Sequence, residues 1–346
     1  MVTQKDPIRL AIIGCGAIAR IAHLKALASL PQYEVSYLCD RDLQIAKTAK
    51  RMFGLRSEVT TRVEDLAGKV DAAIVCVWPS FHLPVTSALL EQKLDVLCEK
   101  PLATTAAEAA EIALSARRAQ RIVAVGQWCR CQKNMWILRK LLSLKFLGEI
   151  HEVVAEFGGE LSWPMTTGAY FDRNFTSGGV MFDAGIHLLD LVSWLFGEIS
   201  DISYEDDSYG GTEANGVLGG TVRFAGRQVP CRVVASWTHR LMNGIRVVGD
   251  EGEAEALFVE PNHVNIVRNL GGERIQIQVG PKDVEMPFLS SSPQEALLED
   301  FAMSVRCRRN PITSAEAAVA PLRFVEEAYA VRRSMRQAWV EEFEST

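Results

Sequence analysis

The stretch IRLAIIGCGAIARIAHLKAL, residues 8–27, joins a short apolar run to a segment with helical spacing through a glycine-rich turn. Gly14, Gly16 and Ala19 form the pattern G-x-G-x-x-A at this junction. In such a pattern the first glycine permits a tight turn, the second lets the backbone approach a pyrophosphate, and the small third residue lets helix pack on strand. The stretch therefore predicts a strand, a dinucleotide-binding turn and a helix. The cofactor contacts expected in the turn are Gly14, Gly16, Ala17 and Ile18.

A second signal for a dinucleotide is Asp40, which ends the strand-like run YEVSYLCD about 20 residues after the glycine pattern. Its carboxylate is expected to accept hydrogen bonds from the adenosine ribose and to repel a 2′-phosphate, which favours NAD over NADP. Arg41 follows directly and could stack on adenine or reach a 2′-phosphate, so NADP stays open. The alternative reading of Asp40 is an ordinary turn residue.

The order of apolar runs predicts two domains. From Ile8 to about Trp128, strand-like and helical patterns alternate, which predicts a Rossmann domain at residues 1–128 with a doubly wound parallel sheet. Strand-like runs follow one another beyond residue 199, so residues 129–346 are expected to form an α+β domain on a large, mostly antiparallel open sheet. An alternative for the C-terminal helices is that they pack against the first domain. Ser292 with Pro293, and Thr105 with Glu108, are typical helix starts.

Composition excludes several classes of protein. The chain has 346 residues, 48% hydrophobic and 23% charged, with a net charge of −6, which suits a globular protein and gives little support for nucleic-acid binding. No apolar run has the roughly 18 residues of a membrane span, so we expect a cytoplasmic protein. The eight cysteines lack a CxxC pair and are expected to be reduced thiols, with no metal site.

Glu99, Lys100 and Pro101 follow the apolar run DVLC. In a doubly wound sheet ligands bind beyond the carboxyl ends of the strands, so Lys100 is expected to point into the cleft beside the nicotinamide. Its ammonium would stabilise an alkoxide or polarise a carbonyl, while Glu99 would hold the nicotinamide amide or orient Lys100. Pro101 would fix the turn, with a cis peptide as one option. The alternative is a strand-to-helix junction with a surface ion pair.

A second constellation stands in GGVMFDAGIHLLDLVSWLFG, residues 178–197. If this segment is helical, Asp183, His187 and Asp190 lie on or near one face. A histidine oriented by an acid is a natural base for removing a hydroxyl proton as hydride leaves the same carbon. The alternative is a structural histidine on an apolar helix.

These motifs, in this order and at these spacings, resemble the glucose-fructose oxidoreductase, inositol dehydrogenase and rhizopine catabolism (Gfo/Idh/MocA) family over nearly the whole chain. The resemblance implies reversible hydride transfer between NAD(P) and a secondary alcohol of a sugar or cyclitol. It assigns catalytic roles to Lys100 and His187, makes Asp183 a substrate-binding acid, and implies a homodimer or homotetramer formed through the C-terminal sheet.

The resemblance also marks residues outside the main motifs. WPSFH looks like the family's segment beside the nicotinamide, with Pro79 and His82 matching and Trp78 in place of the usual small polar residue. VGQWCRC makes Arg130 a candidate ligand for a substrate anion or hydroxyl. Further candidate donors to substrate hydroxyls, each equally readable as a loop anchor, are Tyr170, Arg173 and Asn174.

The sequence thus predicts an NAD(P)-dependent dehydrogenase or reductase acting on CH–OH groups of a small sugar, sugar derivative or cyclitol. Two alternatives remain at this stage. One is NAD-dependent, redox-assisted elimination of a glycosidic group, which would show no net cofactor turnover. The other is a nicotinamide-sensing regulator, which would have no need of Lys100, Asp183 and His187 together.

Overall fold

The computed structural model describes residues 6–164, 171–209, 211–290 and 292–335. The chain divides into two compact units, Met1–Cys131 with Phe288–Val319, and Gln132–Pro287 with Ala320–Thr346. The first unit thus includes residues 129–131 and 288–319, which lie beyond the predicted boundary at residue 128.

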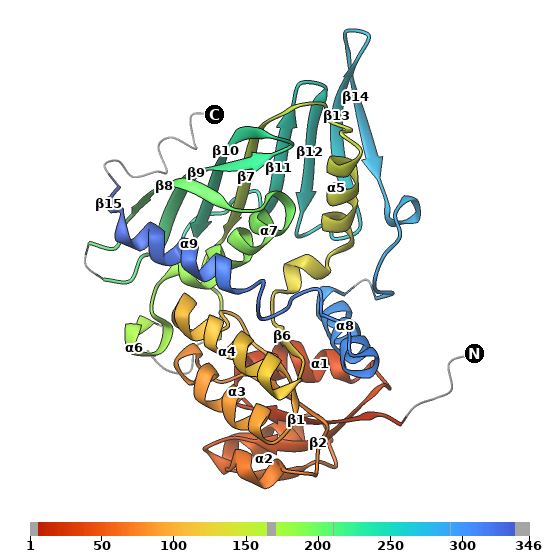
Figure 1. The fold of residues 1–346 in the computed structure, drawn as a ribbon, viewed down its shortest axis with the longest axis vertical. Coiled ribbons are helices and arrows are strands. Elements are labelled where there is room, and N and C mark those ends of the chain that lie inside the picture. The colour runs from red at the N-terminus through yellow and green to blue at the C-terminus, as the bar shows by residue number, and fades with distance from the viewer. Residues whose placement is uncertain (1–5, 165–170, 210, 291, 336–346) are drawn as a thin grey trace. The chain divides into compact units, whose positions relative to one another are not determined.

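The first unit is built on a six-stranded parallel sheet with strand order β3-β2-β1-β4-β5-β6. This is the order of the predicted Rossmann fold, and it reverses between β1 and β4, where such sheets bind ligands beyond their carboxyl ends. Figure 1 labels β1, β2 and β6 of this sheet. Every residue of β4, β5 and β6 is buried, which explains their uninterrupted apolar runs. The strands are β1 (Ile8–Ile13), β2 (Tyr33–Cys39), β3 (Glu58–Thr60), β4 (Ala72–Val75), β5 (Asp95–Cys98) and β6 (Val123–Val125).

The connecting helices begin where the sequence supplies caps. A π-helical turn, Ala19–His23, runs into α1 (Leu24–Leu27), and the later crossovers are α2 (Leu43–Met52), α3 (His82–Glu91) and α4 (Ala106–Ala119). The predicted cap of α4 is confirmed, since the Thr105 side chain accepts the backbone N–H of Glu108 at 3.1 Å. The Glu108 carboxylate binds Thr104 rather than Thr105.

Helix α8 (Pro293–Cys307) also belongs to the first unit and begins at the predicted Ser292 cap. The Tyr33 hydroxyl donates to the Leu298 carbonyl at 2.7 Å, and the guanidinium of Arg308, just beyond the helix, lies 2.7 Å from the buried Asp95 carboxylate. These bonds, more than 200 residues apart in sequence, explain why the segment groups with the parallel sheet.

The second unit is built on a nine-stranded sheet with order β14-β13-β12-β11-β7-β10-β9-β8-β15. Neighbours are antiparallel except for β7 with β10 and β8 with β15, so the predicted mostly antiparallel sheet is confirmed. Helix α5 (Lys133–Ser143) packs on β12 and β13, and α7 (Ile186–Phe196) packs on β7 and β9. The strands are β7 (Ile150–Gly158), β8 (Ile199–Asp206), β9 (Asn215–Phe224), β10 (Arg227–Ser236), β11 (Gly244–Gly249), β12 (Gly252–Leu257), β13 (Val264–Leu270), β14 (Glu273–Val279) and β15 (Arg332–Ser334), and the remaining helices are α6 (Arg173–Thr176) and α9 (Val319–Ala330).

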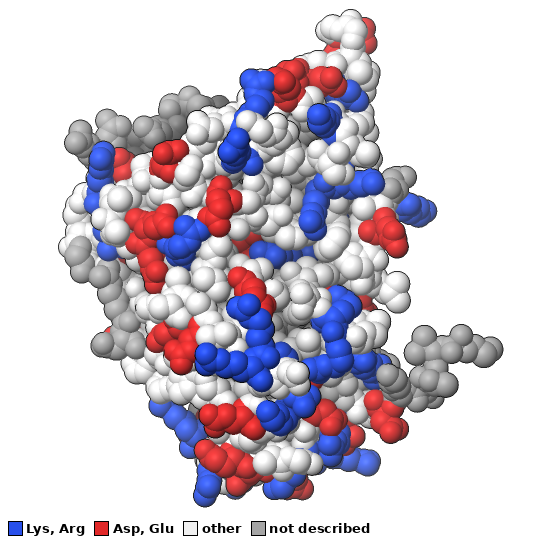
Figure 2. Space-filling view, in the orientation of Figure 1, with Lys and Arg blue, Asp and Glu red and all other residues white. Residues whose placement is uncertain are grey.

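The surface mixes charges of both signs. In Figure 2, Lys and Arg side chains are interspersed with Asp and Glu. No helix among the described residues has the length and apolar character needed to cross a membrane. In the part of the chain that the structure describes there is also no group of three or more His, Cys, Asp or Glu side chains that could hold a metal ion. The eight cysteines are free thiols, and all except Cys307 are buried.

Candidate functional site

The glycine turn connects β1 to the helix that follows it. Gly14 has a φ of +84°, and a Cβ atom there would meet the Cys76 carbonyl oxygen at 2.8 Å, so the turn requires glycine. Gly16 has open space where its Cβ would point. The first glycine therefore serves the packing of β1 against the end of β4, while the second leaves room for a ligand.

Asp40 directly follows β2 and binds the glycine turn. Its carboxylate accepts the backbone N–H of Cys15 at 2.8 Å and that of Asp42 at 2.9 Å. The side chain is only half-buried, and Arg41 is exposed. A negative charge is thus held in a fixed position beside the turn.

Lys100 stands directly after β5, on a cis peptide bond with Pro101. The lysine is half-buried, and its backbone N–H donates to the Glu99 carboxylate at 3.0 Å. The other Glu99 oxygen lies 2.7 Å from Nε2 of the buried His23, and Gln294 of α8 donates to Nδ1 of that ring at 3.2 Å. Both Glu99 oxygens therefore have partners within the unit.

The Glu99 carboxyl is fully buried. Burial alone would raise its pKa, but the hydrogen bond with His23 and the charges of His23 and Lys100 outweigh it, and the pKa is lowered from its ordinary value of 4.5. A Cβ on Gly126 would meet the Glu99 carboxylate at 2.8 Å, so the absence of a side chain at this position leaves space for the carboxylate.

The lowered pKa of Glu99 predicts how stability depends on pH. An acid with a depressed folded-state pKa stabilises the fold above its ordinary pKa and loses that contribution as pH falls through the folded value. We expect the free energy of unfolding of Glu99→Gln to lie below that of the wild type at pH 6, and the gap to shrink below about pH 4.5. Urea unfolding across this range measures it, with exposed Glu111→Gln as control. A gap that stays constant down to pH 3 would contradict the assignment.

The segment after β4 carries Trp78, Pro79 and His82. His82 is completely buried, with Nδ1 2.9 Å from the Pro101 carbonyl oxygen and Nε2 3.0 Å from that of Val77. Burial lowers the pKa of His82, and the two carbonyls oppose the shift. The ring thus ties the turn after Lys100 to the end of β4, while Trp78 and Pro79 are half-buried beside it.

The second unit holds the other predicted catalytic pair. Asp183 lies in a π-helical turn, Met181–Gly185, which continues into α7, so the predicted helical segment is confirmed. His187 is in the first turn of α7 and is buried, as is Asp190, whereas Asp183 is half-buried.

Three aromatic side chains lie near this pair. The Trp237 indole donates to the Asp183 carboxylate at 3.4 Å, and Phe171 meets Trp237 edge to face with ring centroids 5.8 Å apart. The ring centroids of Phe157 and His187 lie 6.2 Å apart. Trp237 follows β10 some 50 residues after Asp183 and has no local motif, so the sequence alone does not predict its place beside the acid.

The other residues predicted to bind substrate are Arg130, Tyr170, Arg173 and Asn174. Arg130 lies in a 3₁₀ turn, Trp128–Cys131, where it is buried and donates to the Ile312 carbonyl at 3.4 Å. Tyr170 and the side chains of Arg173 and Asn174 lie outside the described residues.

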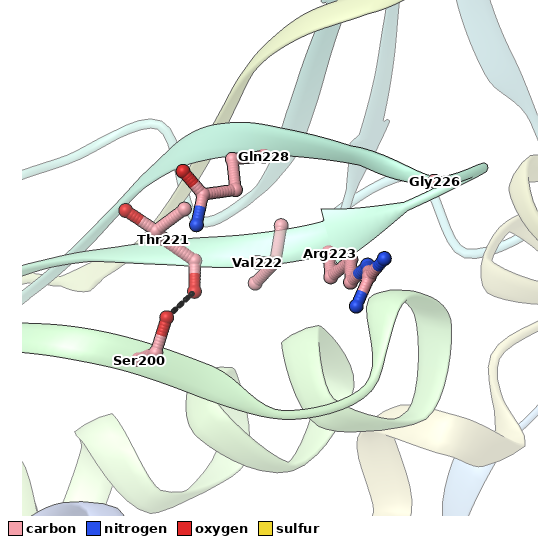
Figure 3. A pocket seen from close by; sticks show the side chains of 6 residues that line it. All are labelled: Ser200, Thr221, Val222, Arg223, Gly226 and Gln228. Atoms are coloured by element: carbon pink, nitrogen blue, oxygen red, sulfur yellow. Dashed lines mark hydrogen bonds between the residues drawn. The ribbon is translucent and has the colours of Figure 1, made fainter.

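A hollow of about 410 Å³ lies on β8, β9 and β10 (Figure 3). Ser200, Thr221, Arg223 and Gln228 are among its lining residues, and Ser200 donates to the Thr221 carbonyl at 3.3 Å. None of the predicted site residues lines this hollow, so it gives no support to the site.

The strand order, the glycine turn and the acid after β2 define the first unit as a dinucleotide-binding unit. Residues 8–127 match the oxidoreductase family with an NAD-binding Rossmann fold, and residues 136–255 match the GFO/IDH/MocA C-terminal domain. The chain therefore belongs to the GFO/IDH/MocA oxidoreductase family.

Among curated relatives, D-glucoside 3-dehydrogenase of Escherichia coli is 30% identical over 193 residues, which cover 56% of this chain and 55% of that protein. Rhizopine catabolism protein MocA of Rhizobium meliloti is 26% identical over 337 residues, 92% of this chain and 93% of that protein. Several other relatives likewise match over about half their length.

Solved structures share the fold over most of the chain. A Kribbella flavida oxidoreductase domain protein has a TM-score of 0.80 at 20% identity, covering 94% of this chain and 97% of that one. Levoglucosan dehydrogenase, in complex with NADH and levoglucosan, has a TM-score of 0.81 at 16% identity, covering 94% and 98%.

Proposed function

We propose that the protein is an NAD-dependent dehydrogenase that transfers hydride between the nicotinamide and a secondary alcohol or ketone of a sugar, sugar derivative or cyclitol. The observation that carries the proposal is Lys100, fixed directly after β5 through its backbone bond to Glu99, beyond the carboxyl end of the parallel sheet. Two relatives, named for glucoside and levoglucosan oxidation, support the substrate class.

In this mechanism the Lys100 ammonium stabilises the developing alkoxide, and His187 takes the hydroxyl proton as hydride leaves the same carbon. Asp183 binds a neighbouring hydroxyl and orients the substrate and the histidine. Lys100 and His187 belong to different compact units, so their joint action on one substrate is part of the proposal. When bound, the nicotinamide supplies the hydride acceptor.

Residues of the first unit would hold the cofactor. The pyrophosphate would occupy the open space at Gly16 beside Ala17 and Ile18, and the Asp40 carboxylate would accept hydrogen bonds from the ribose hydroxyls. Trp78 and Pro79 would lie along the nicotinamide.

Asp40 should set the preference for NAD. In Asp40→Asn the amide oxygen still accepts the Cys15 N–H, but the charge that repels a 2′-phosphate is gone. We expect the ratio of Kd for NADPH to Kd for NADH to fall roughly a hundredfold, because opposing like charges costs several kcal/mol. Fluorescence titration with NADH and NADPH measures the ratio, with exposed Glu64→Gln as control. A ratio unchanged within threefold would refute this role of Asp40.

The sheet of the second unit is the proposed surface for self-association into a dimer or tetramer. Helices α5 and α7 pack against this sheet. Light scattering of the purified protein would measure the molecular mass of the assembly.

The function is tested by incubating the protein with NAD or NADP and a panel of inositols, free sugars and sugar nucleotides, and recording the absorbance of reduced cofactor. Substrate-dependent reduction, lost in His187→Ala while the cofactor still binds, supports the proposal. Release of a glycosidic group without net reduction would favour the elimination reaction. Cofactor binding with no turnover of any compound would favour a sensor.

A further inference from the structure

Glu213 contacts three successive residues at the start of the helical segment that carries Asp183 and His187. Its carboxylate accepts the backbone N–H of Gly179 at 3.1 Å and of Met181 at 3.2 Å. Its own carbonyl oxygen accepts the N–H of Val180 at 3.0 Å. The first N–H groups of a helix have no partner within the helix. Here Glu213, distant in sequence, accepts from the first helical residue, Met181, and from the two residues before it.

The local sequence supplies no substitute for this residue. Val180 stands at the position before the helical segment, and no side-chain cap bond is formed there. A Cβ on Gly179 would meet the Glu213 carbonyl oxygen at 2.1 Å, and one on Gly178 would meet the Tyr329 hydroxyl at 2.3 Å. The paired glycines therefore let the backbone approach Glu213 and Tyr329 of the protein itself.

Glu213 is in turn fixed by side chains from the C-terminal part of the unit. The Glu213 oxygen that accepts from Gly179 and Met181 also accepts the hydroxyl of Tyr329 of α9. The Arg332 guanidinium lies 3.4 Å from the other carboxylate oxygen. Arg332 also pairs with the buried Asp206 at 2.6 Å and lies over the Tyr329 ring. Glu213 itself is fully buried, and burial raises its pKa while the Tyr329 hydrogen bond and the Arg332 charge oppose the rise.

We infer that Glu213 is a positioning residue, which acts with Tyr329 to set the place of Asp183 and His187 by holding the first turn of their helix. Asp183 lies two residues beyond the anchored Met181, and its N–H donates to the anchored Gly179 at 3.0 Å. A shift of the first turn moves the carboxylate and, one turn later, the imidazole. The inference rests on the proposed function for its kinetic consequence only.

The test compares Glu213→Asp with Glu213→Gln. Aspartate keeps the charge but is one methylene shorter, so it cannot reach both N–H groups, whereas glutamine keeps an acceptor oxygen at the same reach. We expect kcat to fall about 30- to 100-fold in Glu213→Asp and to stay within about fivefold in Glu213→Gln, with the Kd for NADH unchanged in both. Tyr329→Phe, which removes one donor and keeps the ring, should lower kcat about three- to tenfold.

A spectroscopic readout separates this inference from the proposed function. In protein labelled with ¹⁵N-histidine, the His187 signal is identified by its loss in His187→Asn. We expect this signal to shift in Glu213→Asp and to stay in place in Glu213→Gln and in the exposed control Glu205→Asp, whether or not a substrate has been found. A Glu213→Asp protein with a lower Tm but an unmoved His187 signal, or with unchanged kcat, would show a structural role alone and overturn the inference.

Discussion

Lys100→Ala should lower kcat for the oxidised alcohol by about 10²- to 10³-fold, because the alkoxide that develops during hydride transfer loses its positive partner. The turn itself should survive, since the bond from residue 100 to the Glu99 carboxylate is made by the backbone N–H. Affinity for NADH should therefore stay within about threefold. Steady-state kinetics and NADH fluorescence on the same preparations measure the two effects.

Two further variants separate charge from packing. Lys100→Met keeps most of the apolar stem without the ammonium and should be as inactive as the alanine variant, whereas exposed Lys25→Ala should match the wild type. If Lys100→Met keeps a third or more of the wild-type kcat, the ammonium has no catalytic role and the proposed mechanism is wrong.

Gly14→Ala and Gly16→Ala should separate folding from cofactor binding. At Gly14 a Cβ would meet the Cys76 backbone at 2.8 Å, and its φ of +84° strains any residue with a side chain. We expect Gly14→Ala to lose about 2 to 4 kcal/mol of unfolding free energy without ligand. At Gly16 the space is open, so Gly16→Ala should unfold like the wild type but bind NADH about tenfold or more weakly, because its methyl group occupies the pyrophosphate space.

Denaturant unfolding without cofactor and NADH titration measure this pair. Equal destabilisation by both substitutions would contradict the division of roles between the glycines. So would a Gly16→Ala protein with wild-type affinity for NADH, which would place the pyrophosphate elsewhere.

Much of the fold could be predicted because its signals are local. The runs that become β4, β5 and β6 are apolar throughout, since parallel strands are buried on both faces, and the helices between them are capped by nearby residues such as Thr105. The glycine turn is equally local, because backbone conformation and close packing restrict Gly14 to glycine.

The remaining features depend on contacts between distant parts of the chain. His23 and Glu99 meet across 76 residues, and Glu213 reaches Gly179 across 34, so neither pair forms a motif. A Cβ at Gly178 or Gly179 would meet atoms of Tyr329 or Glu213, and neither contact has a local sequence signal. Helix α8 joins the first unit through Tyr33, a contact that helical periodicity does not encode.

The central claim is direct hydride transfer from a secondary alcohol to the nicotinamide. The measurement that tests it most directly is a single turnover with NAD and a fully deuterated form of the sugar or cyclitol that the panel identifies, followed by NMR of the reduced cofactor. The account predicts one deuterium at C4 of the nicotinamide and none when Lys100→Ala is used over the same time. Reduced cofactor that carries only solvent hydrogen at C4, or equal labelling by Lys100→Ala, would contradict it.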